Sequence, residues 1–325
     1  MFDKNMPLIK EEHYLIDDIK EFFLEATYEK ITINITGKDE ITVRQFGEPS
    51  VDKEYTCSFG NGVLHLNFPG RHIVGFFDFS LYRKNIEIEI EMPLKYYNAI
   101  KVNAISGSIK INGHPSWSDV NIENKSGRIS IQKIECSTLF LKSSSGSINL
   151  DSATVKNQSN IKASSGSIRL NELKSLRSSI EAKSGSIHCL NIECENELLI
   201  STNSGSIKAE RVSCESFNMN LTSGSLSLSY LNGCGNVFTS SGSVRVRSFK
   251  MCGNTFINTS SGSVHTSLAP TQNYSLNIKT SSGSINSRNP LYYEGNTKNR
   301  AAVTIGDGSS GTLSVSTSSG SVHIS

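Results

Sequence analysis

Residues 183–208 read KSGSIHCLNIECENELLISTNSGSIK and contain one full period of a repeat that extends over much of the chain. The signature Ser-Gly-x-aliphatic occurs twelve times between residues 106 and 322. Its first ten copies follow one another at spacings of 18 to 21 residues, which indicates a stack of similar units. The signature glycines are Gly107, Gly127, Gly146, Gly166, Gly185, Gly205, Gly224, Gly242, Gly262, Gly283, Gly311 and Gly320.

Apolar residues recur at every second position on both sides of each signature, which is the pattern of β-strands. The inward-facing positions change parity at the glycine, so the backbone has to bend there. Glycine permits the positive φ or the close backbone approach that a tight corner requires. A coil of about 20 residues at about 3.3 Å each fits a flattened prism of two or three sides. We therefore predict an all-β fold, a right-handed parallel β-solenoid (β-helix).

The pattern divides the chain into two predicted regions. Residues 1–98 contain short alternating stretches such as IEIEIEMP, and we expect a β-rich entry or cap region there. Residues 99–325 form the predicted repeat array, with irregular coils near the C-terminal end. Residues 286–304 interrupt the period, and we expect a loop that covers part of the last coils.

Charge is unevenly distributed along the chain. Residues 1–100 contain 11 Lys/Arg and 17 Asp/Glu, a net charge of −6, whereas residues 101–325 contain 21 and 13, a net charge of +8. The basic array is suited to an anionic partner, although two differently solvated surfaces explain the asymmetry equally well.

The repeat resembles a bacterial family of β-strand-repeat domains of unknown function whose members are called putative adhesins. The matching pieces are IEIEIEMP, IKVNAISGSIKI, the ladder of SGSI copies and the final LSVSTSSGSVHI. The resemblance implies a β-solenoid that binds at a surface. It implies no catalytic residue.

The third residue after each signature glycine is predicted to point outward, and no acidic residue occupies that position. We interpret it as a basic stripe for an anionic polymer, a membrane surface or another protein. A solvated strand face is the alternative. Nucleic acid is disfavoured, because aromatic residues do not interleave with these charges. The candidate binding residues are Lys110, Arg169, His188, Lys208, Arg245 and His265.

Two further sets of residues follow the period. Cys136, Cys194, Cys214, Cys234 and Cys252 lie nine or ten residues after a signature glycine, and we expect a column of buried thiols, with disulfides between stacked neighbours as the alternative. Four apolar residues should point outward, and we expect the N-terminal region to cover them, with an exposed contact surface as the alternative. They are Phe140, Leu199, Phe238 and Phe256.

Enzymatic activity has little support in the sequence. The serines of the repeat are indistinguishable from one another, and a serine nucleophile requires a base held by a third group. Polysaccharide-cleaving β-helix enzymes are a remote alternative, because the only aspartates of the array are Asp119, Asp151 and Asp307. We expect no cofactor and no metal site, since the cysteine column is linear and zinc requires tetrahedral ligands.

We therefore predict a non-enzymatic, adhesin-like binding protein that presents a long repetitive surface. The alternative is an intracellular scaffold that assembles end to end through the strand Val322-His323-Ile324. Because no signal peptide or membrane-spanning segment is recognisable, we expect a cytoplasmic location, with the cell surface as the alternative.

Overall fold

The computed structural model describes the chain except for residues 1–5, 49–53, 70–85, 271, 289 and 294–298. All regular elements within the described residues are β-strands, and none of these residues forms a helix that could span a membrane. Contacts divide the chain into two compact units, residues 1–156 and 157–325, which we describe separately. The boundary between them falls within strand β12 (Ile148–Ala163).

Two ladders of hydrogen-bonded strands build the N-terminal unit. One runs in the order β1, β4, β7, β3, β9 and β11, and the other in the order β5, β6, β2, β8, β10 and β11. The inner pairings are parallel, whereas the pairs β1–β4, β4–β7 and β5–β6 are antiparallel. The strands are β1 (Leu8–Leu15), β2 (Glu21–Ala26), β3 (Lys30–Thr36), β4 (Glu40–Phe46), β5 (Thr56–Gly60), β6 (Val63–Asn67), β7 (Glu87–Pro93), β8 (Ala99–Ala104), β9 (Ile109–Asn112), β10 (Ser116–Asn124) and β11 (Ile129–Ser143).

The first signature coil rests directly on a coil from the start of the chain. Strands β2 and β3 pair in parallel with β8 and β9, so residues 21–36 continue the solenoid pattern without a signature glycine. The corner between β2 and β3 is formed by Thr27, Tyr28 and Glu29, where the Glu29 carboxylate accepts hydrogen bonds from the backbone N–H groups of the other two. The predicted boundary at residues 98/99 stays a prediction.

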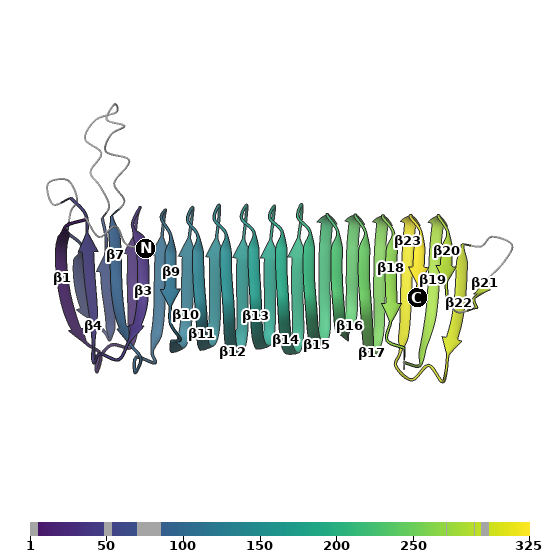
Figure 1. Ribbon diagram of the computed structural model, residues 1–325, viewed down its shortest axis with the longest axis horizontal. Coiled ribbons are helices and arrows are strands. Elements are labelled where there is room, and N and C mark those ends of the chain that lie inside the picture. Colours follow the sequence, from purple (N-terminus) through teal and green to yellow (C-terminus); the bar gives the residue numbers. More distant parts are fainter. Residues whose placement is uncertain (1–5, 49–53, 70–85, 271, 289, 294–298) are drawn as a thin grey trace, which may run out of the picture. The chain divides into compact units, whose positions relative to one another are not determined.

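In the C-terminal unit, each of the strands β13 to β17 pairs in parallel with the next one along the chain (Figure 1). The prediction of a parallel β-solenoid with coils of about 20 residues is confirmed. The strands are β13 (Ile168–Ala182), β14 (Ile187–Thr202), β15 (Ile207–Ser223), β16 (Leu226–Ser241), β17 (Val244–Ser261), β18 (Val264–Leu268), β19 (Tyr274–Ser282), β20 (Ile285–Ser287), β21 (Tyr292–Tyr293), β22 (Arg300–Ile305), β23 (Thr312–Ser319) and β24 (Val322–Ile324).

Each coil is a single long strand that bends twice between signatures. In β15 the buried positions shift parity between Ala209 and Val212 and again between Cys214 and Phe217, and the signature itself makes the third bend. The register between neighbouring coils also slips at the second of these bends, for example between Ser213 and Ser216. Differences in coil length are therefore absorbed at the second bend, and the other two sides stay aligned.

The last coils do not follow sequence order. Strand β23 lies between β17 and β19, and β24 lies between β18 and β20, which places the yellow β23 beside green strands in Figure 1. Strand β22 covers β19 in antiparallel orientation, and β21 pairs with β22. The interruption that we expected to form a loop therefore includes a small antiparallel cover. Residues 289 and 294–298 of that interruption lie outside the described residues.

The signature glycines lie so close to the preceding coil that no side chain fits. A Cβ atom built on Gly205 would meet the carbonyl oxygen of Gly185 at 2.0 Å, and one on Gly224 would meet that of Gly205 at 2.0 Å. Gly205 has a negative φ, so close approach is the property that these glycines share. Gly311 is the exception, because it lies against Gly253 and outside this column.

Polar residues three positions before the glycine hold many of these corners together. Thr202 accepts a hydrogen bond from the N–H of Gly205 at 3.1 Å and donates one to the carbonyl of Gly185 at 3.2 Å. Asn124 makes the same two contacts with Gly127 and Gly107. The sequence analysis explained the corner by its glycine and missed this bridge, although Thr, Ser and Asn recur at that position.

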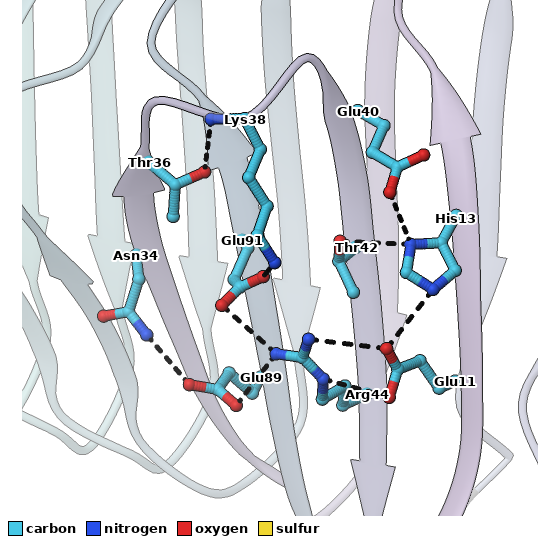
Figure 2. A network of polar contacts seen from close by, with 10 residues as sticks. All are labelled: Glu11, His13, Asn34, Thr36, Lys38, Glu40, Thr42, Arg44, Glu89 and Glu91. Carbon is cyan, nitrogen blue, oxygen red and sulfur yellow. Dashed lines mark hydrogen bonds and ion pairs between the residues drawn. The ribbon is translucent and has the colours of Figure 1, made fainter.

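A charged network covers the outer face of the first ladder of the N-terminal unit (Figure 2). Arg44 of β4 lies between Glu11 of the edge strand β1 and Glu91 of β7, with N···O distances of 3.1 and 3.2 Å. Lys38 also pairs with Glu91, and His13 bonds to Glu11 and Glu40. Burial opposes ionisation of Glu91, but hydrogen bonds from Lys38 and Arg44 outweigh it and lower its pKa. Charged side chains on an edge strand disfavour pairing with other molecules.

Replacing a corner glycine should destabilise the C-terminal unit strongly. In Gly205→Ala the new methyl group collides with the Gly185 carbonyl, so we expect a loss of about 3 kcal/mol or more in unfolding free energy. Urea denaturation followed by circular dichroism measures it. Gly37→Ala is the matched control, because no atom lies within 4 Å of its Cβ position, and it should change stability by less than about 0.5 kcal/mol. Equal effects of the two substitutions would refute the close-approach explanation.

The Glu91 carboxylate should stabilise the N-terminal unit in a pH-dependent way. A lowered pKa in the folded state means that the stabilisation is present above the usual value of 4.5 and is lost as the pH falls through the folded pKa. Glu91→Gln should therefore cost about 1–2 kcal/mol at pH 7 and much less near pH 3, measured by urea denaturation at both values. Glu54→Gln, at an exposed position, is the control. A cost that does not change with pH would contradict the assignment.

Candidate functional site

The predicted stripe forms a continuous column in the C-terminal unit. Register pairs join Arg169 to His188, His188 to Lys208, Lys208 to Ser227 and Ser227 to Arg245. The column continues with His265 and His323, and the neutral Asn286 lies beside His323. Successive coils lie about 4.8 Å apart, so these seven residues extend over about 29 Å. We call the set the basic column: Arg169, His188, Lys208, Ser227, Arg245, His265 and His323.

The permanent cations of the basic column alternate with titratable or neutral residues. Arg169, Lys208 and Arg245 occupy every second coil, which separates them by about 9.6 Å. All three are exposed, and none has an ion-pair partner within the described residues. Their positive charge is therefore available to a ligand.

The positive charge of the basic column affects the pKa of His265, near the end of the column. Burial lowers the pKa of His265, and the positive charges of Arg245 and His323 lower it further. The rings of His265 and His323 lie 5.9 Å apart. The buried Nδ1 of His265 has no hydrogen-bond partner in the described part of the chain. An anion bound here would relieve the repulsion between these groups.

Lys110 belongs to the N-terminal unit. It is exposed on β9, in register with Thr32 and Ser130, and so has no basic neighbour within its own ladder. Ser314, which follows Gly311, does not join the basic column, because it pairs with Phe256 and Asn277 on another side of the coils.

That other side is an uncharged face. Over five neighbouring coils, the outward positions four and six residues before the signature glycine contain amides, hydroxyl groups, one leucine and two exposed phenylalanines. The sequence analysis found the apolar members but missed the asparagines, which recur four and six residues before the signature glycine. The uncharged face consists of Leu199, Ser201, Asn218, Asn220, Asn236, Phe238, Phe256, Asn258, Ser314 and Ser316.

The apolar residues of this face are open to solvent. Leu199, Phe238 and Phe256 are 37%, 46% and 45% exposed. Their expected burial under the N-terminal region is therefore wrong. Phe140, in the N-terminal unit, is half-buried.

The expected column of buried thiols exists only in part. Cys136, Cys194 and Cys214 are buried nine residues after a signature glycine, whereas Cys234 is half-buried and Cys252 is exposed, each at the tenth position. One residue changes the side of the strand that a side chain occupies. The buried ninth position is filled by Gly233 and Met251 in the coils of these two cysteines.

The strand proposed for end-to-end assembly is not an edge. Strand β24 is hydrogen-bonded to β18 on one side and to β20 on the other, so Val322-His323-Ile324 offers no open ladder. As for metal chemistry, no group of three or more His, Cys, Asp or Glu side chains is placed to hold an ion within the described residues.

The family model of Toastrack DUF4097 matches residues 19–196 and 157–325. Similar solved structures include a putative adhesin from Bacteroides fragilis NCTC 9343, which is 16% identical and has a TM-score of 0.47, with 73% of this chain and 97% of that chain covered. Another putative adhesin, from Parabacteroides distasonis ATCC 8503, is 13% identical with a TM-score of 0.40, and 99% and 98% are covered. A putative cell adhesion protein from Clostridium sporogenes ATCC 15579 is 13% identical with a TM-score of 0.21, and 97% and 98% are covered.

No curated protein matches the chain. The family match covers more than half of the residues and agrees with the resemblance carried by the SGSI repeat. The chain therefore belongs to the Toastrack DUF4097 family.

Proposed function

We propose that this protein is a non-enzymatic, adhesin-like binding protein, and that the basic column holds an extended anionic polymer. The observation that carries the proposal is the alternation along the column, where Arg169, Lys208 and Arg245 repeat at about 9.6 Å and have no ion-pair partners among the described residues. Elsewhere in the same unit a surface lysine is neutralised by an acidic neighbour: Lys174 forms an ion pair with Glu193 at 3.0 Å.

The spacing favours a ligand with one acidic group at every second coil. A polysaccharide with one carboxylate per disaccharide has that character, and its intervening hydroxyl groups would face the imidazoles and Ser227. Electrostatic attraction of this kind is long-ranged, weakens with salt and acts without an enclosed pocket. The solenoid contributes rigidity, because each coil is fixed by ladders on both sides.

We include a cytoplasmic location in the proposal, with the cell surface as the alternative. All seven cysteines are free, which supports a reducing compartment. Cell fractionation with an antibody against the protein tests this part, and recovery at the outer surface would contradict it.

Charge reversal on the basic column should abolish polymer binding. The double variant Lys208→Glu/Arg245→Glu should bind hyaluronan at least about tenfold more weakly than the wild type, measured by biolayer interferometry at low and physiological salt. The matched control is Lys250→Glu/Lys279→Glu, which makes the same change in net charge at exposed positions outside the column. An equal loss of hyaluronan affinity in both variants would mean that only the net charge of the protein matters, and it would overturn the proposal.

Two additional ligands distinguish the competing surfaces. Vesicles of phosphatidylglycerol test whether a membrane replaces the polysaccharide, and dextran tests binding without charge. Retention on dextran that is unaffected by Lys208→Glu/Arg245→Glu and lost in Phe238→Ala/Phe256→Ala would assign binding to the uncharged face. That outcome, or binding to vesicles alone, would contradict the proposal.

Binding should strengthen in mild acid. The pKa of His265 is lowered in the free protein, and a bound anion raises it, so binding is coupled to proton uptake. The affinity for hyaluronan should therefore rise between pH 7.5 and pH 5.5. His265→Gln should reduce this dependence, and an unchanged pH profile in that variant would exclude His265 from the site.

A further inference from the structure

Two thiols from adjacent coils meet at the second bend of the C-terminal unit. The Sγ atoms of Cys234 and Cys252 both donate to the carbonyl oxygen of Glu215, at 3.3 and 3.5 Å. Because both sulfurs contact one oxygen atom, they occupy the same small volume. Cys234 belongs to β16 and Cys252 to the neighbouring β17, so no residue separates them along the stacking direction.

The backbone around these thiols is locally irregular. The register between β16 and β17 passes from Gly233–Met251 to Gly235–Thr255, which leaves extra residues of β17 unpaired beside Cys234. A Cβ atom on Gly253 would lie 3.2 Å from the Sγ of Cys234, so the glycine provides room for that thiol. Bulges of this kind permit local bending, and a disulfide requires Cα atoms about 4.4–6.8 Å apart with little tolerance for strain.

One thiol of the pair, that of Cys252, faces an open groove of about 620 Å³, and the other, that of Cys234, is half-buried. Cys252 lines this groove and is exposed, whereas Cys194 and Cys214, which also line it, are buried. Burial raises the pKa of Cys214 to about 12, so less of this thiol is ionised at neutral pH than of Cys252. Other side chains lining the groove are Lys174, Glu193, Glu195, Glu215 and Asn232.

We propose that Cys234 and Cys252 form a dithiol modification site that reacts with small disulfides and closes to a disulfide bond between adjacent coils. The Cys252 thiolate attacks one sulfur of a reagent RSSR, forms a mixed disulfide and releases RS⁻. The Cys234 thiolate then attacks the Cys252 sulfur, forms the intramolecular bond and releases the second RS⁻. Two electrons pass from the protein to the reagent, and the two thiol protons complete two molecules of RSH.

The two steps have different rates. Burial and the hydrogen bond with Cys234 raise the pKa of Cys252 to about 11, so little thiolate is present at neutral pH and the first step is slow. Its rate should rise about tenfold per pH unit between pH 7 and pH 9. The second step is fast, because the attacking thiol is already in place.

Peptide mapping of the full chain tests the site. The protein is incubated with 2-hydroxyethyl disulfide, quenched in acid, alkylated and digested with trypsin. The reagent should join the fragments 212–245 and 251–279, with the loss of two hydrogens and no retained reagent. Fragment 212–245 contains Cys214 as well as Cys234, so the variants below assign the bond.

Single serine variants separate the roles of the thiols. Cys234→Ser should stop at a mixed disulfide on Cys252, and Cys214→Ser should form the crosslink as the wild type does. Circular dichroism verifies that each variant is folded. The proposal is overturned if the wild type retains reagent on both Cys234 and Cys252, or if the crosslink persists in Cys234→Ser. It also fails if mixed light and isotopically heavy protein gives crosslinks between molecules.

Discussion

In the C-terminal unit, the position where a corner side chain would begin is occupied by a carbonyl oxygen of the coil before it. The Cβ position of Gly205 lies 2.0 Å from such an oxygen, and those of Gly185 and Gly242 lie 2.0 and 1.9 Å away. Only a residue without a side chain fits, so each coil is placed on its predecessor at a defined point. The period-two alternation of the strands then decides which residues face the core and which face solvent. Columns in register follow from this alignment.

The same alignment produces two different surfaces on one scaffold. On the strand that leaves the corner, the third residue after the glycine repeats as a cation, an imidazole or a hydroxyl, which creates the basic column. On the strand that enters the corner, amides and two phenylalanines create the uncharged face. Neither surface requires a cavity. A ligand that binds along such a column gains from repetition, because each coil adds one contact at an equal step.

Much of the repeat geometry could be predicted from the sequence. The alternating apolar residues and the Ser-Gly corners indicated a parallel solenoid. The third position after the glycine aligns in register from Arg169 to His265, but Lys110 and Ser314 at the same position lie outside this column. The positions of Cys234 and Cys252 could not be derived, because the second bend absorbs the variation in coil length and a shift of one residue reverses the side. The order in which the last coils stack could not be predicted from the sequence either. Segments such as 274–287 and 312–324 carry the same pattern, so the sequence does not indicate which one pairs with β17.

The position of β23 has a mechanical consequence. In most stacked arrays the last segment of the sequence is also the last layer, and it frays first. Here residues 312–324 are synthesised after residues 274–287 but lie between them and β17, with a ladder on each side. Pulling on this segment would have to break two ladders at once. Residues 312–324 thus fix residues 274–287 to the rest of the array, and they can do so only after both segments have been synthesised.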